Sequence, residues 1–219
     1  MKNYEPQQFN KRIFGKEPFH FIDGLGTILF IFFIAVFIVF MAFSKVYTGI
    51  AISGPSMMPT FNDEYLDYPQ KEDTAYYKPV EDNVFNYGDI VIADAGGTDP
   101  IIKRVVGLPG DRVKIDKYLD GNYYLYINGT RQNEDFIYSR DDMKISFESF
   151  VHLYQDIEIT VPEGEIFILG DNRGNSNDST FYGCFAFEKI LGRVDYVVDS
   201  NDIPIIELFI EFFLPIFKK

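Results

Sequence analysis

Few side chains in this sequence could build a metal site or a disulfide framework. Among 219 residues there are one cysteine, Cys184, two histidines, His20 and His152, and no tryptophan. A single thiol cannot form a disulfide within the chain, and a zinc site needs several His or Cys ligands. We therefore expect no metal and no cofactor, and we expect Cys184 to be a small buried apolar residue.

Positive charge is scarce as well. The chain contains 20 Lys and Arg against 33 Asp and Glu, which gives a formal net charge of −13. Nucleic-acid-binding proteins neutralise phosphates with clustered Lys and Arg, so a nucleic-acid partner is not expected. Because 47% of the residues are hydrophobic, the chain can bury a core of its own, and disorder of the whole chain is excluded.

A long uncharged segment near the N-terminus predicts a membrane anchor. It runs for 21 residues from Gly24 to Ser44. At about 1.5 Å per residue, a helix of this length reaches about 30 Å and crosses the hydrocarbon core of a bilayer. The alternatives are a cleaved signal peptide, whose apolar region is usually shorter and ends in an A-x-A site, and a buried core helix. We predict an uncleaved transmembrane helix over 24–44.

The charges on either side of this segment predict its orientation. Four basic residues precede it, whereas after Lys45 the next basic residue is Lys71. By the positive-inside rule, residues 1–23 are cytoplasmic, and residues 45–202 form an extracytoplasmic domain of a single-pass protein of the cell membrane. Residues 46–219 hold 15 basic and 30 acidic side chains, so the acidity of the chain lies outside the cell.

Turn residues separate short β-branched and aromatic runs throughout the outer domain. The dipeptides Asp-Gly at 120–121 and Asn-Gly at 128–129 are type I′ turn signals, and no long segment of helical period separates the runs. We predict a mainly β fold, an antiparallel β-barrel or sandwich, with an accessory lobe at 117–155 and a mobile polar loop at 62–87. The predicted strands lie within 88–94, 100–111, 157–161, 165–169 and 191–198.

The C-terminal segment, 203–219, has an apolar stretch of 15 residues that contains Glu207, Glu211 and Pro215. This stretch is short for a bilayer crossing, and its carboxylates oppose burial in lipid. Because the two glutamates lie four residues apart, on one helical face, we predict an amphipathic helix on the membrane surface. A second membrane span and a helix packed on the core are the alternatives.

Two segments carry side chains of chemical interest. In GPSMMPTF, Gly54–Phe61, Ser56 lies in a turn rich in Gly and Pro, where it is either an ordinary turn residue or a nucleophile. In the run IIKRVV, Lys103 shares one strand face with Ile101 and Val105. A lysine on an apolar face either extends to solvent, as on many edge strands, or has a lowered pKa.

A third segment, ILGDNRGNSNDSTFYG at Ile168–Gly183, is a surface turn cluster or part of a site, and it lacks the residue order of a calcium loop. A serine nucleophile needs a base. His20 lies on the cytoplasmic side of the anchor, and His152 lies in the region with the fewest motifs. A neutral lysine can serve instead, because burial can supply the roughly 3 kcal/mol that lowers its pKa from about 10.4 to about 8. Lys103 is the best candidate.

Four segments, in order after an N-terminal anchor, resemble the sequence boxes of bacterial type I signal peptidases, membrane-bound Ser/Lys endopeptidases that remove signal peptides. They are GPSMMPTF, GDIVIAD, IIKRVVGLPGD and GDNRGNSNDSTFYG, and the resemblance covers about 45–114 and 161–198. It implies that Ser56 is the nucleophile and Lys103 the general base. It also implies that Ser176 orients the lysine amine through a hydrogen bond, and that Asp178 holds the loop carrying Ser176.

The resemblance further implies a bound substrate. An extended peptide would add as a strand beside the nucleophile, with pockets for small apolar side chains lined by Ile52, Met57 and Ile102. Ordinary core packing is the alternative for each of the three, and for Ile52 it is an equal alternative. The Ser56 backbone N–H would stabilise the oxyanion. The implied partners are preproteins with signal peptides and the lipid bilayer, and we expect the protein to be a monomer.

Two positions depart from the family pattern. Gly54 stands where some relatives carry a serine that donates to the oxyanion, so that hydroxyl is absent. Thr180 stands where the usual D-S-R order has arginine, so Arg173 or another cation must pair with Asp178, or the loop is looser.

Three other functions remain open. The first is an assembly chaperone of the same fold, which would be expected to lack the nucleophile or the base. The second is a self-cleaving cytosolic repressor, against which the anchor and the lack of a DNA-binding module argue. The third is a surface-anchored domain with a binding role only.

Overall fold

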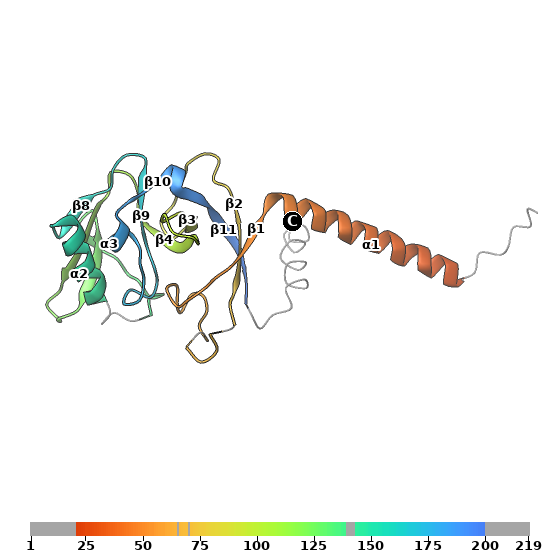
Figure 1. Ribbon diagram of the computed structural model, residues 1–219, viewed down its shortest axis with the longest axis horizontal. Coiled ribbons are helices and arrows are strands. Elements are labelled where there is room, and N and C mark those ends of the chain that lie inside the picture. Colours follow the sequence, from red (N-terminus) through yellow and green to blue (C-terminus); the bar gives the residue numbers. More distant parts are fainter. Residues whose placement is uncertain (1–20, 65, 70, 139–142, 200–219) are drawn as a thin grey trace, which may run out of the picture. The chain divides into compact units, whose positions relative to one another are not determined.

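The computed structural model describes residues 21–199, apart from 65, 70 and 139–142 (Figure 1). Most of the predicted cytoplasmic segment, 1–23, lies outside the described residues. The segment 203–219 also lies outside them, so the predicted surface helix there stays a prediction. The chain divides into two compact units, Met1–Lys45 and Val46–Lys219.

The described part of the first unit is a helix, α1 (Phe21–Val46), which ends at the start of the second unit. Within it, Gly24–Val46 forms an apolar stretch of 23 residues with a mean hydropathy of 2.9. It is the one helix in the described part of the chain that is long and apolar enough to cross a membrane. The hydrocarbon core of a bilayer offers no hydrogen-bond partners to the backbone, whereas a helix satisfies its backbone N–H and C=O groups internally. The predicted span at 24–44 is therefore helical, and its crossing of a bilayer stays a prediction.

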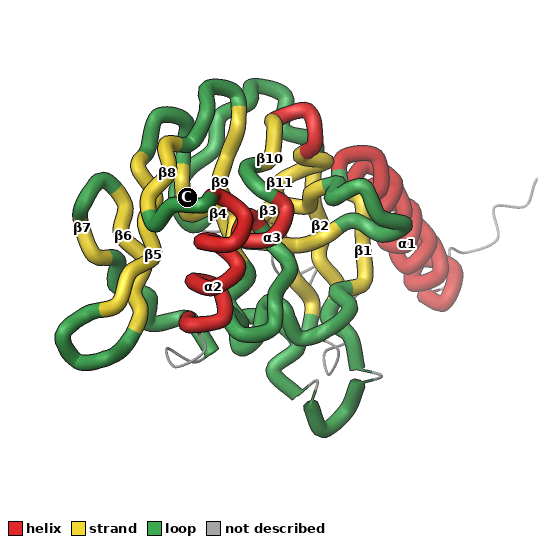
Figure 2. The backbone as a smooth tube through the Cα atoms, turned by 60° about the vertical axis from the view of Figure 1, so that its left-hand side comes forward, coloured by secondary structure: helices red, strands yellow, loops and turns green. Residues whose placement is uncertain are grey.

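The second unit is mainly antiparallel β-structure, as predicted, and its larger sheet is a curled half-barrel (Figures 1 and 2). The strand order is β1-β2-β11-β3-β4-β9-β10, so β1 has one edge unpaired within the described sheet. The strands are β1 (Thr48–Ala51), β2 (Thr74–Lys78), β3 (Ile90–Ala93), β4 (Ile101–Gly107), β9 (Glu165–Leu169), β10 (Phe185–Ala186) and β11 (Ile190–Val198).

Alternation of side chains along β3 and β4 gives the sheet two apolar faces. Val91 packs with Val105 and Ile168 in one cluster of buried residues. Ile92 and Ile102, which alternate with the residues of the first cluster along β3 and β4, pack in another cluster with residues of the Gly- and Pro-rich turn. A strand that is covered on both faces of its sheet has an almost continuous apolar sequence. The run IIKRVV around Lys103 is nearly of this kind.

A smaller sheet begins before residue 117 and ends after residue 155, so it includes the segment for which an accessory lobe was predicted. Its order is β7-β6-β5-β8, from β7 (Thr130–Arg131), β6 (Tyr123–Ile127), β5 (Arg112–Lys117) and β8 (Glu158–Thr160). Asn128 and Gly129 link β6 to β7 with φ of 52° and 79°, the positive values that a type I′ turn requires. The helix α2 (Met143–Tyr154) covers this sheet, and its Phe150 is fully buried.

Two expectations about local structure were wrong. The polar stretch 62–87 is not all loop, because β2 pairs with both β1 and β11 inside it. The helix α2 was not expected. Its inner face carries Ser146 between Met143 and Phe150, and this polar residue obscures the helical period. Short elements complete the chain, namely α3 (Ser179–Tyr182) and the 3₁₀ turn η1 (Phe187–Lys189).

Cys184 is partly buried against the core of the smaller sheet, close to the environment predicted for it. Its sulfur lies 3.7 Å from the Tyr154 hydroxyl oxygen. Burial raises the pKa of the thiol to about 11. The side chain therefore stays a protonated thiol at neutral pH and is a poor nucleophile.

Candidate active site

The turn that carries Ser56 is held from both sides. Gly54 adopts a φ of 83°, which lets the chain reverse directly after β1. The Met58 amide donates to the Pro55 carbonyl at 3.1 Å. The Asn62 side-chain amide donates to the carbonyls of Ile52, at 2.5 Å, and Gly54, at 3.0 Å. These hydrogen bonds fix the backbone on which the serine stands.

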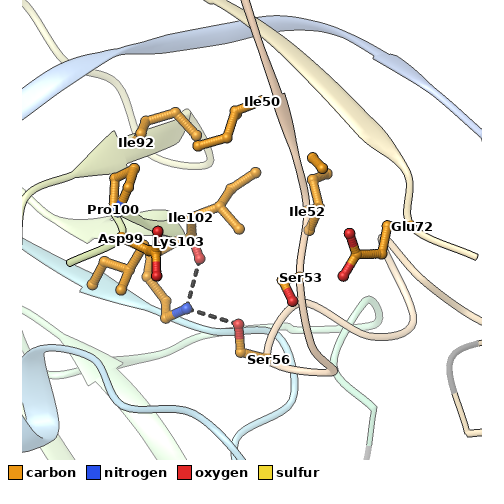
Figure 3. A pocket seen from close by; sticks show the side chains of 12 residues that line it. Ile50, Ile52, Ser53, Ser56, Glu72, Ile92, Asp99, Pro100, Ile102 and Lys103 are labelled. Atoms are coloured by element: carbon orange, nitrogen blue, oxygen red, sulfur yellow. Dashed lines mark hydrogen bonds between the residues drawn. The ribbon is translucent and has the colours of Figure 1, made fainter. Parts of the chain in front are cut away.

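The amine of Lys103 meets the hydroxyl of Ser56. Lys103 lies on β4 opposite Val91 of β3, and it is only 2% exposed. Its Nζ donates to Ser56 Oγ at 2.8 Å and to the Ile102 carbonyl oxygen at 2.7 Å (Figure 3). The two residues are 47 positions apart in the sequence and come together because β4 runs beside the turn that follows β1.

Burial changes the acidity of this amine. Desolvation lowers the pKa of Lys103 from 10.5 to about 8, and the charges of Asp178 and Asp171 limit the decrease. A substantial fraction of the amine is therefore neutral near pH 8. A neutral amine within hydrogen-bond distance of a hydroxyl can accept its proton, which is the arrangement of an activated serine nucleophile.

The loop after β9 packs directly on the serine turn. The Asn172 backbone amide donates to the Ser56 carbonyl, and its side-chain amide donates to the Pro55 carbonyl, both at 3.1 Å. A Cβ atom at Gly170 would lie 2.4 Å from the Ser56 carbonyl oxygen and 2.3 Å from Ser176 Oγ. Only glycine permits this approach, so the third sequence box braces the first.

Asp178 organises this loop without an ion pair in the part of the chain that the structure describes. Its carboxylate is fully buried and accepts from the backbone amides of Gly170 and Thr180, each at 3.0 Å. The Thr180 hydroxyl also donates to it at 2.9 Å. Two alternatives were expected here, a replacement cation such as Arg173 or a looser loop, and among the described residues Asp178 is held by neutral donors that include the Thr180 hydroxyl.

Arg173 instead joins the loop to the accessory lobe. Its guanidinium forms an ion pair with Glu134, and both side chains are buried. Its Nε donates to the Gly170 carbonyl at 2.9 Å, and its own carbonyl accepts from Ser146 of α2 at 2.7 Å. Arg173 was one of the cations considered for Asp178, but it pairs with Glu134 instead, a residue outside the boxes on a segment with no recognisable motif.

A second ion pair, between a partly buried arginine and a buried aspartate, joins β4 to the loop. Arg104, next to Lys103 in sequence, makes a bidentate contact with the fully buried Asp171, at 2.9 and 2.6 Å. Thr60 donates to the same carboxylate at 2.5 Å. The contacts of Arg104 and Thr60 with Asp171 were not anticipated from the sequence. The position of a charged residue, Arg104, directly beside Lys103 in the sequence was a signal for an ion pair at this place.

Ser176 lies at the site, but no hydrogen bond joins it to Lys103. Its Oγ is buried next to Gly170 and has no hydrogen-bond partner among the described residues. The two hydrogen bonds that the structure shows for the Lys103 amine go to Ser56 and to the Ile102 carbonyl. The orienting bond expected from Ser176 is therefore not formed in this arrangement.

A cavity of about 310 Å³ opens beside the Ser56 and Lys103 pair (Figure 3). Ile52 and Ile102 line it as expected. Met57 does not line it: it is 1% exposed and packs in the core, in the same cluster as Ile92 and Phe61. The remaining lining residues, which the sequence did not single out, are Ile50, Ala51, Ser53, Glu72, Ile92, Asp99, Pro100 and Ile101.

Within the described residues, no group of three or more His, Cys, Asp or Glu side chains is placed to hold a metal ion. What these residues offer is a hydroxyl, a buried amine and an apolar cavity. A hydrolase with a serine nucleophile requires groups of these kinds: a hydroxyl, a base beside it and a cavity for the substrate.

Comparison with known proteins agrees with this class. The family model "Signal peptidase, peptidase S26" matches residues 25–198. Signal peptidase I P of Bacillus subtilis subsp. natto is 33% identical over 180 residues, which cover 80% of this chain and 88% of that protein. Signal peptidase I S of Bacillus subtilis is 31% identical over 75% of this chain and 83% of that protein. Signal peptidase IB of Staphylococcus aureus is 28% identical over 74% and 83%.

The chain therefore belongs to the signal peptidase family, peptidase S26, and is a serine endopeptidase. Members of this family are membrane-anchored and act on preproteins that carry signal peptides. A crystal structure of a signal peptidase I from Enterococcus faecalis V583 aligns with 50% of this chain and 96% of that chain, at 26% identity and a TM-score of 0.35.

Proposed function

We propose that the protein removes N-terminal signal peptides from exported proteins, with Ser56 as the nucleophile and Lys103 as the general base. The observation that carries the proposal is the 2.8 Å contact between Ser56 Oγ and the Nζ of a lysine that is 2% exposed. The neighbouring Arg104 cannot take this role, because it is paired with Asp171 and its guanidinium cannot be deprotonated in a protein.

The chemistry proceeds in two halves. In the first, neutral Lys103 takes the proton of Ser56 while Oγ bonds to the scissile carbonyl carbon. The ammonium then returns this proton to the leaving nitrogen as the C–N bond breaks, which frees the mature protein and leaves the signal peptide as an ester on Ser56. In the second, water gives a proton to the amine and attacks the ester. The signal peptide leaves as a carboxylic acid, and Oγ recovers its proton.

The negative charge of each tetrahedral intermediate needs a donor. We assign this role to the backbone N–H of Ser56, in the turn that Asn172 and Asn62 hold in place. One preorganised donor of this kind is worth about 3–4 kcal/mol in the transition state. Because residue 54 is a glycine, no side-chain hydroxyl contributes from that position.

The substrate would bind as an added strand. β1 is the last strand of the larger sheet, so one of its edges is unpaired within the described sheet. Residues 50–53, in and just after β1, line one side of the cavity, and residues 99–103, entering β4, line the other. An extended peptide between them would place alternate side chains over Ile52 and Ile102. Isoleucine walls leave room for small apolar side chains such as alanine.

We further propose that α1 crosses the cell membrane with residues 1–23 in the cytoplasm and the catalytic unit outside. The excess of Lys and Arg before the helix supports this orientation. A chaperone or a pure binding domain of the same fold would not need a buried lysine beside the serine. A buried amine without an ionic partner lowers the free energy of unfolding. Its presence beside Ser56 therefore supports a catalytic role over a purely structural one.

The test uses the full chain in lipid vesicles with a preprotein substrate. Ser56→Ala and Lys103→Ala should each reduce cleavage by at least about 10³-fold while folding is retained. Lys144→Ala, which removes an exposed lysine of α2, is the matched control and should cleave normally. If either active-site variant processes the preprotein at the wild-type rate, the proposed function is wrong.

A further inference from the structure

The cavity beside the catalytic pair has two acidic walls as well as an apolar floor. Glu72, on the segment leading into β2, and Asp99, on the segment leading into β4, both line it. In Figure 3, Glu72 lies beyond Ile52 and Ser53 on one side, and Asp99 lies beside Pro100 on the other. The remaining lining side chains are isoleucine, alanine, proline, serine and the buried lysine.

Neither carboxylate is neutralised within the described residues. No ion pair joins Glu72 or Asp99 to any described Lys or Arg. Lys71, the neighbour of Glu72, pairs with Glu64, and Asp99 accepts from the Thr98 hydroxyl at 2.9 Å. Both side chains reach solvent, Asp99 more than Glu72. Their charge is therefore available to a molecule that enters the cavity.

The net charge of the cavity depends on the protonation state of Lys103. Lys103 is the one cation among the lining residues, and the proposed mechanism needs it neutral. In the active protonation state, the cavity therefore carries two negative charges and no positive charge. Apolar isoleucine walls lower the local dielectric and strengthen the field of these charges on an occupant.

We propose that Glu72 and Asp99 form a specificity element that favours a Lys or Arg side chain in the part of the preprotein that occupies this cavity. The inference rests on the proposed function, because it requires the cleavage segment to lie between β1 and β4. In an extended peptide, the residues that alternate with the small apolar ones point away from the isoleucine floor, toward the rim. A basic side chain there would meet one or both carboxylates, and an acidic side chain would be repelled.

The effect should be moderate and sensitive to salt. An exposed ion pair is worth at most about 1 kcal/mol, or roughly fivefold in kcat/KM. A single Lys in the cleavage segment should thus raise kcat/KM by about fivefold over Gln, and a single Glu should lower it by a similar factor. At about 1 M salt, where the Debye length falls to about 3 Å, both differences should largely disappear.

The experiment uses the full chain in neutral vesicles and a set of peptides that share one cleavage segment. A single Lys, Gln or Glu is placed in turn at each position around the scissile bond, and kcat/KM is measured for each. The same set is measured with the double variant Glu72→Gln/Asp99→Asn. The control is Glu81→Gln/Glu163→Gln, which makes the same change in net charge at exposed residues outside the cavity.

The proposal predicts at least one position where Lys is preferred over Glu by the wild type and by the control, and where the Glu72→Gln/Asp99→Asn variant shows no preference. It is overturned if the wild type shows no such position. A preference that survives in the double variant also overturns it, as does one that the control loses to the same extent. Cleavage of the Gln peptides reports on the Ser56 and Lys103 chemistry separately, so a failure of the proposed function is distinguishable.

Discussion

The Thr180 hydroxyl lies 2.9 Å from the Asp178 carboxylate and donates a hydrogen bond to it inside a fully buried turn. The same carboxylate accepts a hydrogen bond from the amide of Gly170, the first residue of the loop that packs on the Ser56 turn. Three donors therefore satisfy a buried charge that an arginine could have neutralised. A threonine hydroxyl thus stands where the family pattern has an arginine, and the Asp178 carboxylate still bonds to the Gly170 amide at the start of the loop.

Replacing Thr180 with valine tests this arrangement. The substitution keeps the shape of the side chain but removes one donor from a buried carboxylate, which should cost about 1–3 kcal/mol of unfolding free energy. Urea unfolding of the full chain in detergent measures the change. Thr180→Ser keeps the hydroxyl and should lose less. Equal stability of Thr180→Val and the wild type would mean that the hydroxyl does not hold Asp178.

The Arg173 and Glu134 pair should be far more sensitive than an exposed pair. Glu134→Ala leaves a guanidinium charge buried without its partner and should cost about 3–5 kcal/mol of unfolding free energy. Glu158→Ala removes a pair with Arg112 that is largely exposed and should cost less than about 1 kcal/mol. Urea unfolding measures both. Similar losses for the two variants would show that Arg173 does not depend on the accessory lobe.

The membrane orientation can be read from thiol labelling of intact cells. In a Cys184→Ala background, Leu119→Cys places a thiol at a hairpin tip where the native side chain is 95% exposed. A membrane-impermeant maleimide should label it without permeabilisation, whereas Lys11→Cys should be labelled only after permeabilisation. The reverse pattern would mean that the catalytic unit faces the cytoplasm.

The buried amine should lower stability at neutral pH. The pKa of Lys103 is about 8 in the folded protein and 10.5 for an ordinary lysine, so between these values the unfolded chain binds more protons. The free energy of unfolding should therefore rise with pH from about 8 to about 10.5. Lys103→Met lacks this titration and should be more stable than the wild type near pH 7, by about 3 kcal/mol. Parallel urea titrations at pH 7 and pH 10.5 check whether the gap closes; a constant gap would contradict it.

The sequence predicted those features that depend on local pattern. The predicted strands around Ile92, Lys103 and Ile168 form because apolar runs bounded by Gly, Pro and Asp leave few other conformations. Ser56 and Lys103 could be paired before the fold was known, because the two histidines were poor candidates for the base and the boxes around Ser56 and Lys103 resemble those of a Ser/Lys peptidase family.

Long-range partners could not be predicted in this way. Glu134 lies in a polar segment with no motif, and only the folded lobe brings it to Arg173. Met57 sits beside the nucleophile in sequence, yet the turn directs its side chain into the core rather than the cavity. Glu72 lies in a stretch that resembled a loop, and its position depends on β2, whose pairing with β1 is a tertiary effect.

The pH dependence of kcat/KM tests the central claim that a neutral Lys103 activates Ser56. With the full chain in vesicles and a peptide substrate, the rate should rise about tenfold per pH unit at low pH and level off above a pKa of about 8. Arginine stays charged across this pH range, so its titration cannot produce the rise of the rate with pH. A profile that is flat from pH 6 to pH 10 would contradict the assignment of Lys103 as the base.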